Sequence, residues 1–329
     1  MVKTLIGHKI LPEMPLTRRN AHLIKATLAD SQGLRHIAAA KYIHAPGTKF
    51  ERIIAKLGDS TVTVDLRGVE IVVPNETEKD FAEYLDIEAF YAGRFGKEIY
   101  ALTSEYLIAA QVFNTANTSA GSATNSAVAY TSGNSATISF IADVIASIRR
   151  LRALGEQPDT VVMSGPVYER IRQGALVQAF VRGTLYAGAE TTVETIQKAL
   201  ASFGIKQVLI GDGYYNTAAD NATASLSQLW SNTYIAVCKA GEVGSGGENE
   251  PDGADVPLLG GLGTDAFWEG YAPGGVVSAD KDAQSFEGGI YVESYPNIEL
   301  DAQVLRLKMS NKPYIANTRC LDLIATQYS

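Results

Sequence analysis

The sequence is poor in the residues that build metal centres and disulfide frameworks. Its 329 residues include two cysteines, Cys238 and Cys320. Two cysteines cannot form a disulfide framework, so we expect free thiols in a reducing compartment. No histidine lies three or four positions from another or close to a cysteine, as the numbering shows for His8, His22, His36 and His44. This spacing is not that of a transition-metal site. We therefore predict no metal and no cofactor.

Long apolar runs are also absent. No uninterrupted run reaches the ~18 residues that a membrane span needs. The apolar start of the chain soon meets Lys9 and Glu13, so it has no signal-peptide core. A mean hydropathy near zero, with 46% hydrophobic residues, excludes an intrinsically disordered chain. The length predicts about two domains, and no membrane association is expected.

Charge is distributed unevenly behind a formal net charge of −8. Residues 1–60 carry ten Lys/Arg against four Asp/Glu, a net of +6. Residues 212–301 carry two basic residues against fifteen acidic ones, a net of −13. A basic head and an acidic body on one chain are suited to contacts between copies of that chain. Solvated faces that never meet are an equally open interpretation.

The first third of the chain predicts extended structure followed by a long helix. Residues 1–34 are broken by Pro12 and Pro15 and read as an arm. Strand-like stretches at 37–43 and 61–73 flank a charged tip, which predicts a long hairpin. Asn75 and Glu78 form a capping-box-like start. Apolar residues at helical spacing then continue to Phe113, which predicts a helix of ~40 Å.

The centre of the chain alternates between helical and strand patterns. We predict helices at 138–154, 166–172 and 192–203, and strands at 160–163, 207–210 and 229–238. A glycine-rich acidic loop follows at 241–263. The last part of the chain has strand patterns at 290–294 and 304–309.

No motif supports catalysis. Gly261–Ala266 matches G-x-G-x-x-A by its letters, but the residues that follow cannot form the required helix. Ser164 lacks the glycine two positions earlier that a nucleophile elbow needs. The acidic residues at 248–255 do not have calcium-loop spacing. Arg149, Arg150 and Arg152 suit a helix C-terminus better than a nucleic-acid site. We therefore predict a protein that is not an enzyme.

Several local phrases resemble one family. These segments are residues 66–74 (LRGVEIVVP), 98–113 with EYLIAA, 138–172, 214–218 (YYNTA) followed by Leu229-Trp230, and 306–316 around Lys312-Pro313-Tyr314. Together with the order of elements, these phrases resemble a tailed-bacteriophage major capsid (head) protein of the Hong Kong 97-like fold. The resemblance covers about residues 36–329, by element order and weak patterns.

The resemblance implies an α+β fold with an N-terminal arm, an extended β-hairpin loop, a peripheral domain with a long spine helix and an α/β axial domain. The corresponding ranges are 1–34 for the arm and 35–73 for the extended loop. Residues 74–113 and 288–329 correspond to the peripheral domain. Residues 114–287, with the acidic loop at 241–263, correspond to the axial domain.

The resemblance also implies a role and partners. The chain would self-assemble, as hexamers and pentamers, into an icosahedral head shell in the bacterial host cytoplasm and become part of the virion. The shell would enclose double-stranded DNA without sequence-specific binding. Scaffolding, portal and cement or decoration proteins are the expected partners. We expect the basic residues of the arm and loop to contact neighbouring copies: Arg18, Arg19, Lys49, Arg52, Lys56 and Arg67.

Two alternatives remain open at the level of the sequence. An encapsulin-like nanocompartment shell protein would share the fold but enclose enzymes. An α/β enzyme would place an unrecognised site in the segment from Ile138 to Cys238. A deep pocket with paired titratable groups there would favour the enzyme.

Overall fold

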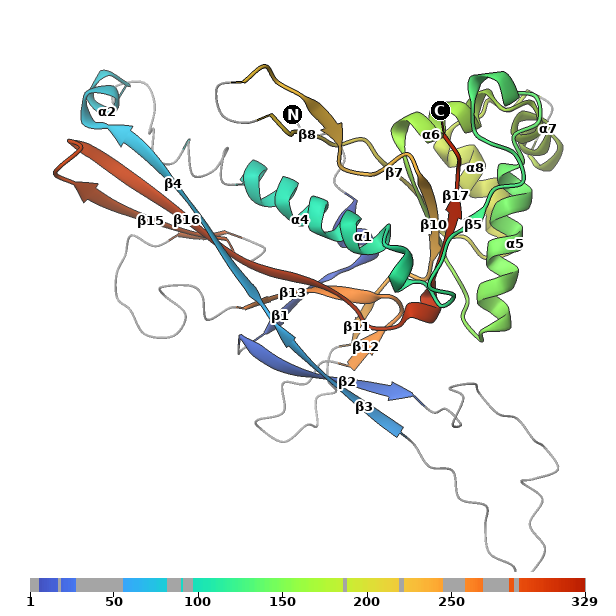
Figure 1. Ribbon diagram of the computed structural model, residues 1–329, viewed down its shortest axis with the longest axis horizontal. Helices are drawn as coiled ribbons and strands as arrows, with labels where there is room; N and C mark the ends of the chain where they lie inside the picture. The colour runs from blue at the N-terminus through green and yellow to red at the C-terminus, as the bar shows by residue number, and fades with distance from the viewer. Residues whose placement is uncertain are drawn as a thin grey trace, which may run out of the picture.

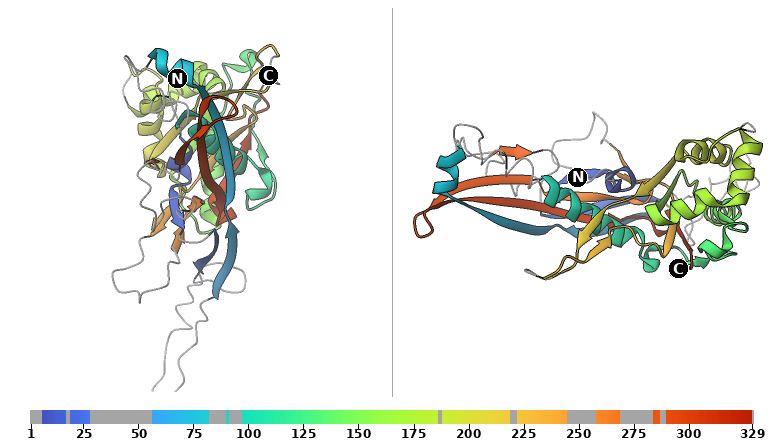
Figure 2. Two further views of the ribbon diagram at one scale, coloured as in Figure 1. Left: turned by 90° about the vertical axis from the view of Figure 1, so that its left-hand side faces the viewer. Right: turned by 90° about the horizontal axis from the view of Figure 1, so that it is seen from above.

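The computed structural model describes residues 6–16, 19–27, 56–81, 90, 97–185, 188–218, 222–244, 258–268, 284–286 and 290–328. The molecule is elongated, with a long narrow sheet reaching to one end and a helix-flanked sheet at the other (Figure 1). A thinner hairpin projects away from both. Figure 2 shows the same arrangement from two further sides.

The long sheet is built around one strand, β16 (Ala302–Ile315). One side of β16 pairs antiparallel with β4 (Asp65–Pro74) along ten residues. Its other side pairs first with β15 (Ile290–Asn297) and then with β13 (Gly263–Trp268). Outer strands β14 (Gln284–Phe286) and β1 (Glu13–Leu16) complete it. The strands predicted at 290–294 and 304–309 are confirmed.

The second sheet carries the main core. Its order is β5 (Thr124–Asn125), β17 (Leu321–Ala325), β10 (Tyr234–Cys238), β6 (Thr160–Ser164) and β7 (Gln207–Gly211). Every residue of β6 is buried, which explains why its sequence is a continuous run rather than an alternation. The strands predicted at 160–163 and 207–210 are confirmed, and the one predicted at 229–238 is shorter.

Four helices pack against one face of this sheet: α5 (Phe140–Ala153), α6 (Gly165–Gln173), α7 (Ala175–Thr184) and α8 (Val193–Leu200). Pro166 lies in the first turn of α6, where its missing N–H costs no hydrogen bond. A Thr192–Thr195 capping box begins α8. Gly204, at φ +98°, ends the short 3-10 turn that follows it. Three helices are confirmed, and α7 is an additional one.

Helix α4 (Lys97–Val112) packs between the two sheets. It contributes Ile108, Ala109 and Val112 to a buried cluster around Trp230, on the opposite side of the second sheet from α5. Helix α2 (Asn75–Phe81) begins at the predicted cap, and α4 ends one residue before the predicted Phe113. Residues 82–89 and 91–96 lie outside the described residues, so one continuous helix stays a prediction.

The projecting hairpin consists of β2 (Asn20–Thr27) and β3 (Lys56–Thr63). With β12 (Leu258–Gly260) and β11 (Glu242–Gly244) it forms a small sheet. The outgoing strand is therefore 20–27, inside the range predicted as an arm, whereas the predicted strand at 37–43 lies outside the described residues. The sequence missed β2 because its pairing partners in β3 lie 29–43 positions away and its own apolar residues are too sparse to mark a strand.

Residues 6–16 of the predicted arm pack against the body. Ile6, Ile10 and Leu11, in and around the short helix α1 (Gly7–Ile10), are at most 2% exposed. Strand β1 pairs in parallel with β13. This segment packs there because its apolar residues Ile6, Ile10 and Leu11 join the buried cluster around Trp230.

Two strands lie on the other side of the predicted domain boundaries. The resemblance implies that β17, within 288–329, belongs to the peripheral unit, whereas β17 lies in the helix-flanked sheet between β5 and β10. Its residues Leu321, Leu323 and Ile324 are buried on both faces, which only a covered sheet allows. β13 was assigned with 114–287 to the axial unit, but it pairs with β16 and β1 of the long sheet.

The segment that matches the glycine motif by its letters overlaps β13. Gly261–Ala266 continues into β13 and not into a helix, as the sequence argument expected. A Cβ on Gly263 would lie 2.0 Å from the carbonyl oxygen of Tyr314. The glycine is therefore needed for close approach of two strands. A separate small hairpin, β8 (Tyr214–Asn216) and β9 (Leu226–Gln228), lies beside α4 through a Tyr106–Tyr215 ring contact.

Candidate functional site

A buried carboxylate joins the N-terminal segment to α4. Glu105 is 3% exposed and accepts the backbone N–H groups of Ile6 at 2.9 Å and Gly7 at 2.6 Å. Its Oε1 also accepts the indole N–H of Trp230 at 2.7 Å. Because a buried carboxylate needs several donors, this arrangement satisfies Glu105 and fixes the start of α1 at once.

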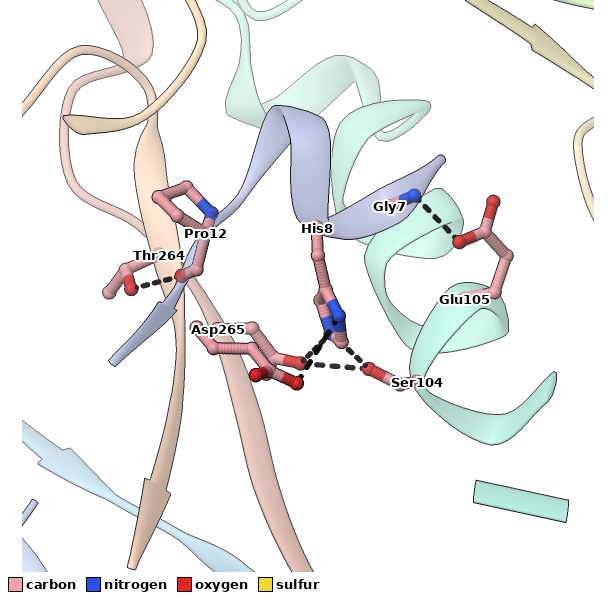
Figure 3. Close-up of polar contacts among 8 residues, drawn as sticks. Gly7, His8, Pro12, Ser104, Glu105, Thr264 and Asp265 are labelled. Carbon is pink, nitrogen blue, oxygen red and sulfur yellow. Dashed lines mark hydrogen bonds and ion pairs between the residues drawn. The ribbon is translucent and has the colours of Figure 1, made fainter. Parts of the chain in front are cut away.

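A second polar cluster lies beside the first, built on the neighbouring residues Ser104 and His8 (Figure 3). Ser104 Oγ donates to Oδ2 of Asp265 at 2.8 Å, and His8 Nε2 lies 3.0 Å from Ser104 Oγ and 3.2 Å from the same Asp265 oxygen. His8 Nδ1 lies 3.3 Å from Glu13 Oε1. Nearby, Thr264 Oγ1 donates to the Pro12 carbonyl at 2.6 Å. Three elements, α1, α4 and β13, thus meet through side chains.

The charges around His8 are mainly negative. Burial lowers the pKa of His8, but the hydrogen bond to Asp265 and the carboxylates of Glu13, Asp265 and Glu105 outweigh it and raise the pKa above its usual 6.5. Asp265 is 1% exposed, and its Oδ1 has no hydrogen-bond partner among the residues that the structure describes. A protonated His8 therefore partly neutralises a buried carboxylate.

This cluster contains the residue types of a hydrolase triad but not its geometry. Ser104 is 1% exposed, so no substrate carbonyl can reach its oxygen, and its hydroxyl donates a hydrogen bond to Asp265. Since Ser104 already donates to Asp265, His8 Nε2 must itself be the donor toward the serine. A general base would have to accept there. The cluster holds the N-terminal segment in place.

A cleft of about 590 Å³ lies beyond the carboxyl ends of the parallel strands β6 and β7. Enzymes of the α/β class bind substrates in this position. Its lining includes Lys9, Tyr168, Glu169, Asp212 and Tyr214. Glu169 and Asp212 are both exposed at the surface. The cleft lacks a buried acid–base pair among its described lining residues.

The long sheet carries cross-strand ion pairs on its surface. Arg306 contacts Glu70 at 2.7 Å and lies over the ring of Tyr295, Lys308 contacts Glu293 at 2.7 Å, and Lys312 contacts Asp65 at 2.8 Å. Most of these side chains are two- to five-tenths exposed. Each pair therefore adds ~0–1 kcal/mol. They link β4 and β15 to the central strand β16.

The predicted contact residues fall partly within the described chain. Arg19 is exposed and its Nε donates to the Val64 carbonyl at 3.4 Å. Arg67, on β4, lies 3.7 Å from Asp65. Both arginines thus lie at the junction of β3 and β4. Lys56 is the first residue of β3, opposite Thr27. Arg18, Lys49 and Arg52 lie outside the described residues.

The residues that anchor the N-terminal segment were not predicted. His8 and Asp265 are 257 positions apart, so no local motif joins them. One signal was available: Glu105 is the only charged residue between Ile99 and Phe113, a mostly apolar stretch. A lone charge in such a stretch indicates a buried partner.

Three further features of the described residues bear on metal binding, thiol reactivity and membrane-spanning helices. Within the part of the chain that the structure describes, no group of three His, Cys, Asp or Glu side chains is arranged to hold a metal ion. Cys238 and Cys320 are free thiols, and burial raises the pKa of Cys320 to about 12. None of the described helices combines the length and apolarity of a membrane span.

Comparison with known proteins gives likeness in structure and not in sequence. No protein-family model matches the chain, and no curated protein matches it. A phage-related protein of Bordetella bronchiseptica superposes with a TM-score of 0.64 at 16% identity, over 98% of this chain and 92% of the other. The capsid of cyanophage P-SCSP1u gives a TM-score of 0.56 at 11% identity, over 100% and 89% of the two chains.

The chain has the fold of a phage capsid protein. The mature capsid of bacteriophage PhiM1 supports this, with a TM-score of 0.51 at 12% identity over 97% of this chain and 86% of that one. The mixture of helices and sheets predicted from the sequence is confirmed. In these three comparisons the similarity extends over 97–100% of this chain.

Proposed function

We propose that the chain is a structural subunit that self-assembles into the icosahedral head shell of a tailed bacteriophage and encloses double-stranded DNA. The observation that carries this proposal is the similarity in fold to a phage-related protein and to a cyanophage capsid, over 98% and 100% of the chain. The finer division into extended loop, spine helix, peripheral and axial domains belongs to the same proposal. In it, β2–β3 is part of the extended loop and α4 is part of the spine.

The shape of the molecule supports a role in assembly. The β2–β3 hairpin and the narrow β4–β16–β15 sheet project from the body (Figure 1). A chain that functioned alone would gain little from such projections, because they bury little surface of their own. In a shell, projecting segments add contact area with neighbours without enlarging the core. Hexamers and pentamers are the expected assemblies.

The partners and place of assembly follow from the same role. We propose that the subunit assembles in the bacterial host cytoplasm with a scaffolding protein and a portal, that cement or decoration proteins bind the finished shell, and that the protein ends in the virion. DNA would be enclosed without sequence-specific contacts. A lining rich in Lys and Arg would neutralise phosphates and hinder packaging.

Negative-stain microscopy of the purified full chain tests the proposal. Closed icosahedral particles are expected, either from the chain alone or after co-expression with a scaffolding protein encoded beside it. A monodisperse monomer of 35.2 kDa at high concentration under both conditions would contradict the proposal. Particles recovered from phage-infected cells should protect DNA from nuclease.

The same particles separate the two alternatives. An encapsulin-like nanocompartment would contain a protein cargo and no genome, which mass spectrometry of purified shells would detect. An α/β enzyme would use the cleft beyond β6 and β7. For the enzyme, Asp212→Asn and Glu169→Gln should abolish an activity of a monomer, whereas a shell subunit should assemble unchanged with either substitution.

A further inference from the structure

The face of the long sheet that α4 covers holds two buried polar side chains with unused hydrogen-bonding atoms. Asp265, on β13, and Asn311, on β16, are each 1% exposed. Asp265 Oδ1 and both polar atoms of the Asn311 amide, Oδ1 and Nδ2, have no hydrogen-bond partner among the residues that the structure describes. A buried polar atom without a partner lowers stability, and native proteins contain few of them. These three atoms therefore indicate a partner other than the described side chains.

The strand register places the two side chains on one face of the sheet. Asp265 pairs with Pro313 in the β13–β16 ladder, and Asn311 lies two residues from Pro313 on β16. Because side chains alternate along a strand, Asn311 points to the same face as Asp265. The two residues are diagonal neighbours, which lie about 7–8 Å apart. A water molecule spans such a gap with two hydrogen bonds of about 2.8–3.0 Å.

Helix α4 closes this position from above. Met309, two residues before Asn311 on β16, packs against Tyr100 of α4. Ser104, one turn further along α4, donates to Oδ2 of Asp265 at 2.8 Å. Asn311 thus lies between two contacts that join the helix to the sheet. Since bulk solvent does not reach the two side chains, a water molecule between them would be held as part of the fold.

The described neighbours of Asp265 leave its Oδ1 without a donor. Ser104 and His8 both meet the other carboxylate oxygen, Oδ2, as Figure 3 shows. Pro313, directly opposite Asp265, has no backbone N–H. An ionised carboxylate can accept about four hydrogen bonds. A buried Asp265 therefore has capacity for a further donor on the side that faces Asn311.

The chemistry of the three atoms selects water among small ligands. An anion would be repelled by the Asp265 carboxylate. A metal cation would suit the oxygen atoms but not the Asn311 Nδ2 group, and it would lie beside His8, which is a cationic partner of Asp265 when protonated. Water can donate to the carboxylate and can either accept from Nδ2 or donate to Oδ1 of the amide. It therefore fits whichever end of the amide faces Asp265.

We propose that a buried water molecule bridges Asp265 Oδ1 and the side-chain amide of Asn311 and is a fixed part of the junction between α4, β13 and β16. Buried waters commonly make two to four hydrogen bonds to polar groups that lack other partners, and these two side chains supply that many. The water gives the buried carboxylate a donor beside Ser104 and His8. The inference does not depend on the proposed shell function, so either can fail while the other stands.

A structure of the full chain at a resolution that shows ordered water tests the site directly. We expect a density peak about 2.7–3.2 Å from both Asp265 Oδ1 and the Asn311 amide. The same structure of Asn311→Leu should lack the peak. A peak about 2.3–2.6 Å from the oxygen atoms would identify a cation such as Ca²⁺ and overturn the inference. A direct hydrogen bond between the two side chains, with no peak between them, would also overturn it.

Thermal unfolding of unassembled chains measures what the bridge contributes. Asn311→Leu removes the amide and leaves Asp265 Oδ1 without a donor, so the unfolding midpoint should fall by several degrees. Gln303→Leu is the matched control. Gln303 points to the same face of β16 and its Oε1 also has no partner among the described residues, but its substitution leaves no carboxylate without a donor. Its midpoint should not fall.

Equal midpoints for the Asn311→Leu and Gln303→Leu chains would show that the amide contributes nothing at this site and would contradict the bridge. Asn311→Ser keeps a hydroxyl and leaves room for water, so its midpoint should lie between those of Asn311→Leu and the wild type. If Asn311→Leu does not fold, the wild-type structure still decides whether the water is there.

Discussion

Glu105 on α4 accepts the backbone N–H of Gly7 at 2.6 Å, across 98 positions of sequence. The contact joins the N-terminal segment to the helix that packs between the two sheets. It also places a charged group in a cluster that is otherwise apolar around Trp230. The stability of this junction therefore depends on the charge of Glu105 and on the lack of a side chain at Gly7.

Glu105→Gln should destabilise the chain by about 2–3 kcal/mol, the usual range for losing hydrogen bonds to a buried charged group. The amide keeps one acceptor oxygen for three donors, and its NH₂ group faces N–H groups that it cannot bind. Denaturant unfolding of unassembled chains measures the change. Glu190→Gln, an exposed acid, is the control and should stay within about 0.5 kcal/mol of wild type. Equal effects of the two substitutions would show that Glu105 is not a structural anchor.

Gly7→Ala should destabilise by about 1–3 kcal/mol through overpacking. Its Cβ would lie 2.7 Å from Glu105 Oε2 and 2.8 Å from Ile108 Cδ1. Gly183, inside α7, is the matched control because a Cβ there meets no atom within 4 Å. Gly183→Ala should stabilise by about 0.5–1 kcal/mol because alanine favours helix. Thermal melts of the two variants should move in opposite directions. A shift in the same direction would contradict the packing argument.

The helices and strands that the sequence predicted well are those with local signals. Helix α5 has apolar residues at helical spacing, and β6 is a short apolar run between turn residues. The sequence missed pairings that depend on distant segments, such as β2 with β3 and β17 with β10. The same reason applies to His8 and Asp265, whose contact depends on β13 lying beside β1. Periodicity reports which face of an element is buried but not which segment covers it.

Stability should depend on pH through His8. Its pKa is raised in the folded chain, so the folded state binds the proton more tightly than the unfolded state. The resulting stabilisation is fully present below pH 6.5, the usual value for the unfolded chain, and is lost as pH rises through the higher folded-state pKa. The free energy of unfolding should thus fall as pH rises above about 6.5.

His8→Gln provides the control for this pH dependence. Glutamine can still donate to Asp265 but carries no charge, so the curve of unfolding free energy against pH should flatten in this region. Proteolysis at the N-terminal segment should follow the same curve in the wild type. A wild-type curve that the substitution leaves unchanged would assign the pH dependence to other groups.

Asp322→Asn should lower the free energy of unfolding more than loss of an exposed ion pair does, because the Asp322 carboxylate is buried. Asp322 is buried on β17, accepts from Arg150 Nε at 3.1 Å and Nη2 at 2.7 Å, and also accepts from Ser147. Losing the charge weakens all three hydrogen bonds. Because Arg150 is 39% exposed and can turn to water, we expect a loss of about 1–3 kcal/mol, less than for a fully buried pair.

Glu169→Gln removes the exposed pair of Glu169 with Arg172 at 3.9 Å and should cost less than about 0.5 kcal/mol. Chemical denaturation of both variants compares them directly. If the two losses are equal, burial of the Asp322 carboxylate does not determine its contribution, and the link between β17 and α5 rests on apolar packing alone.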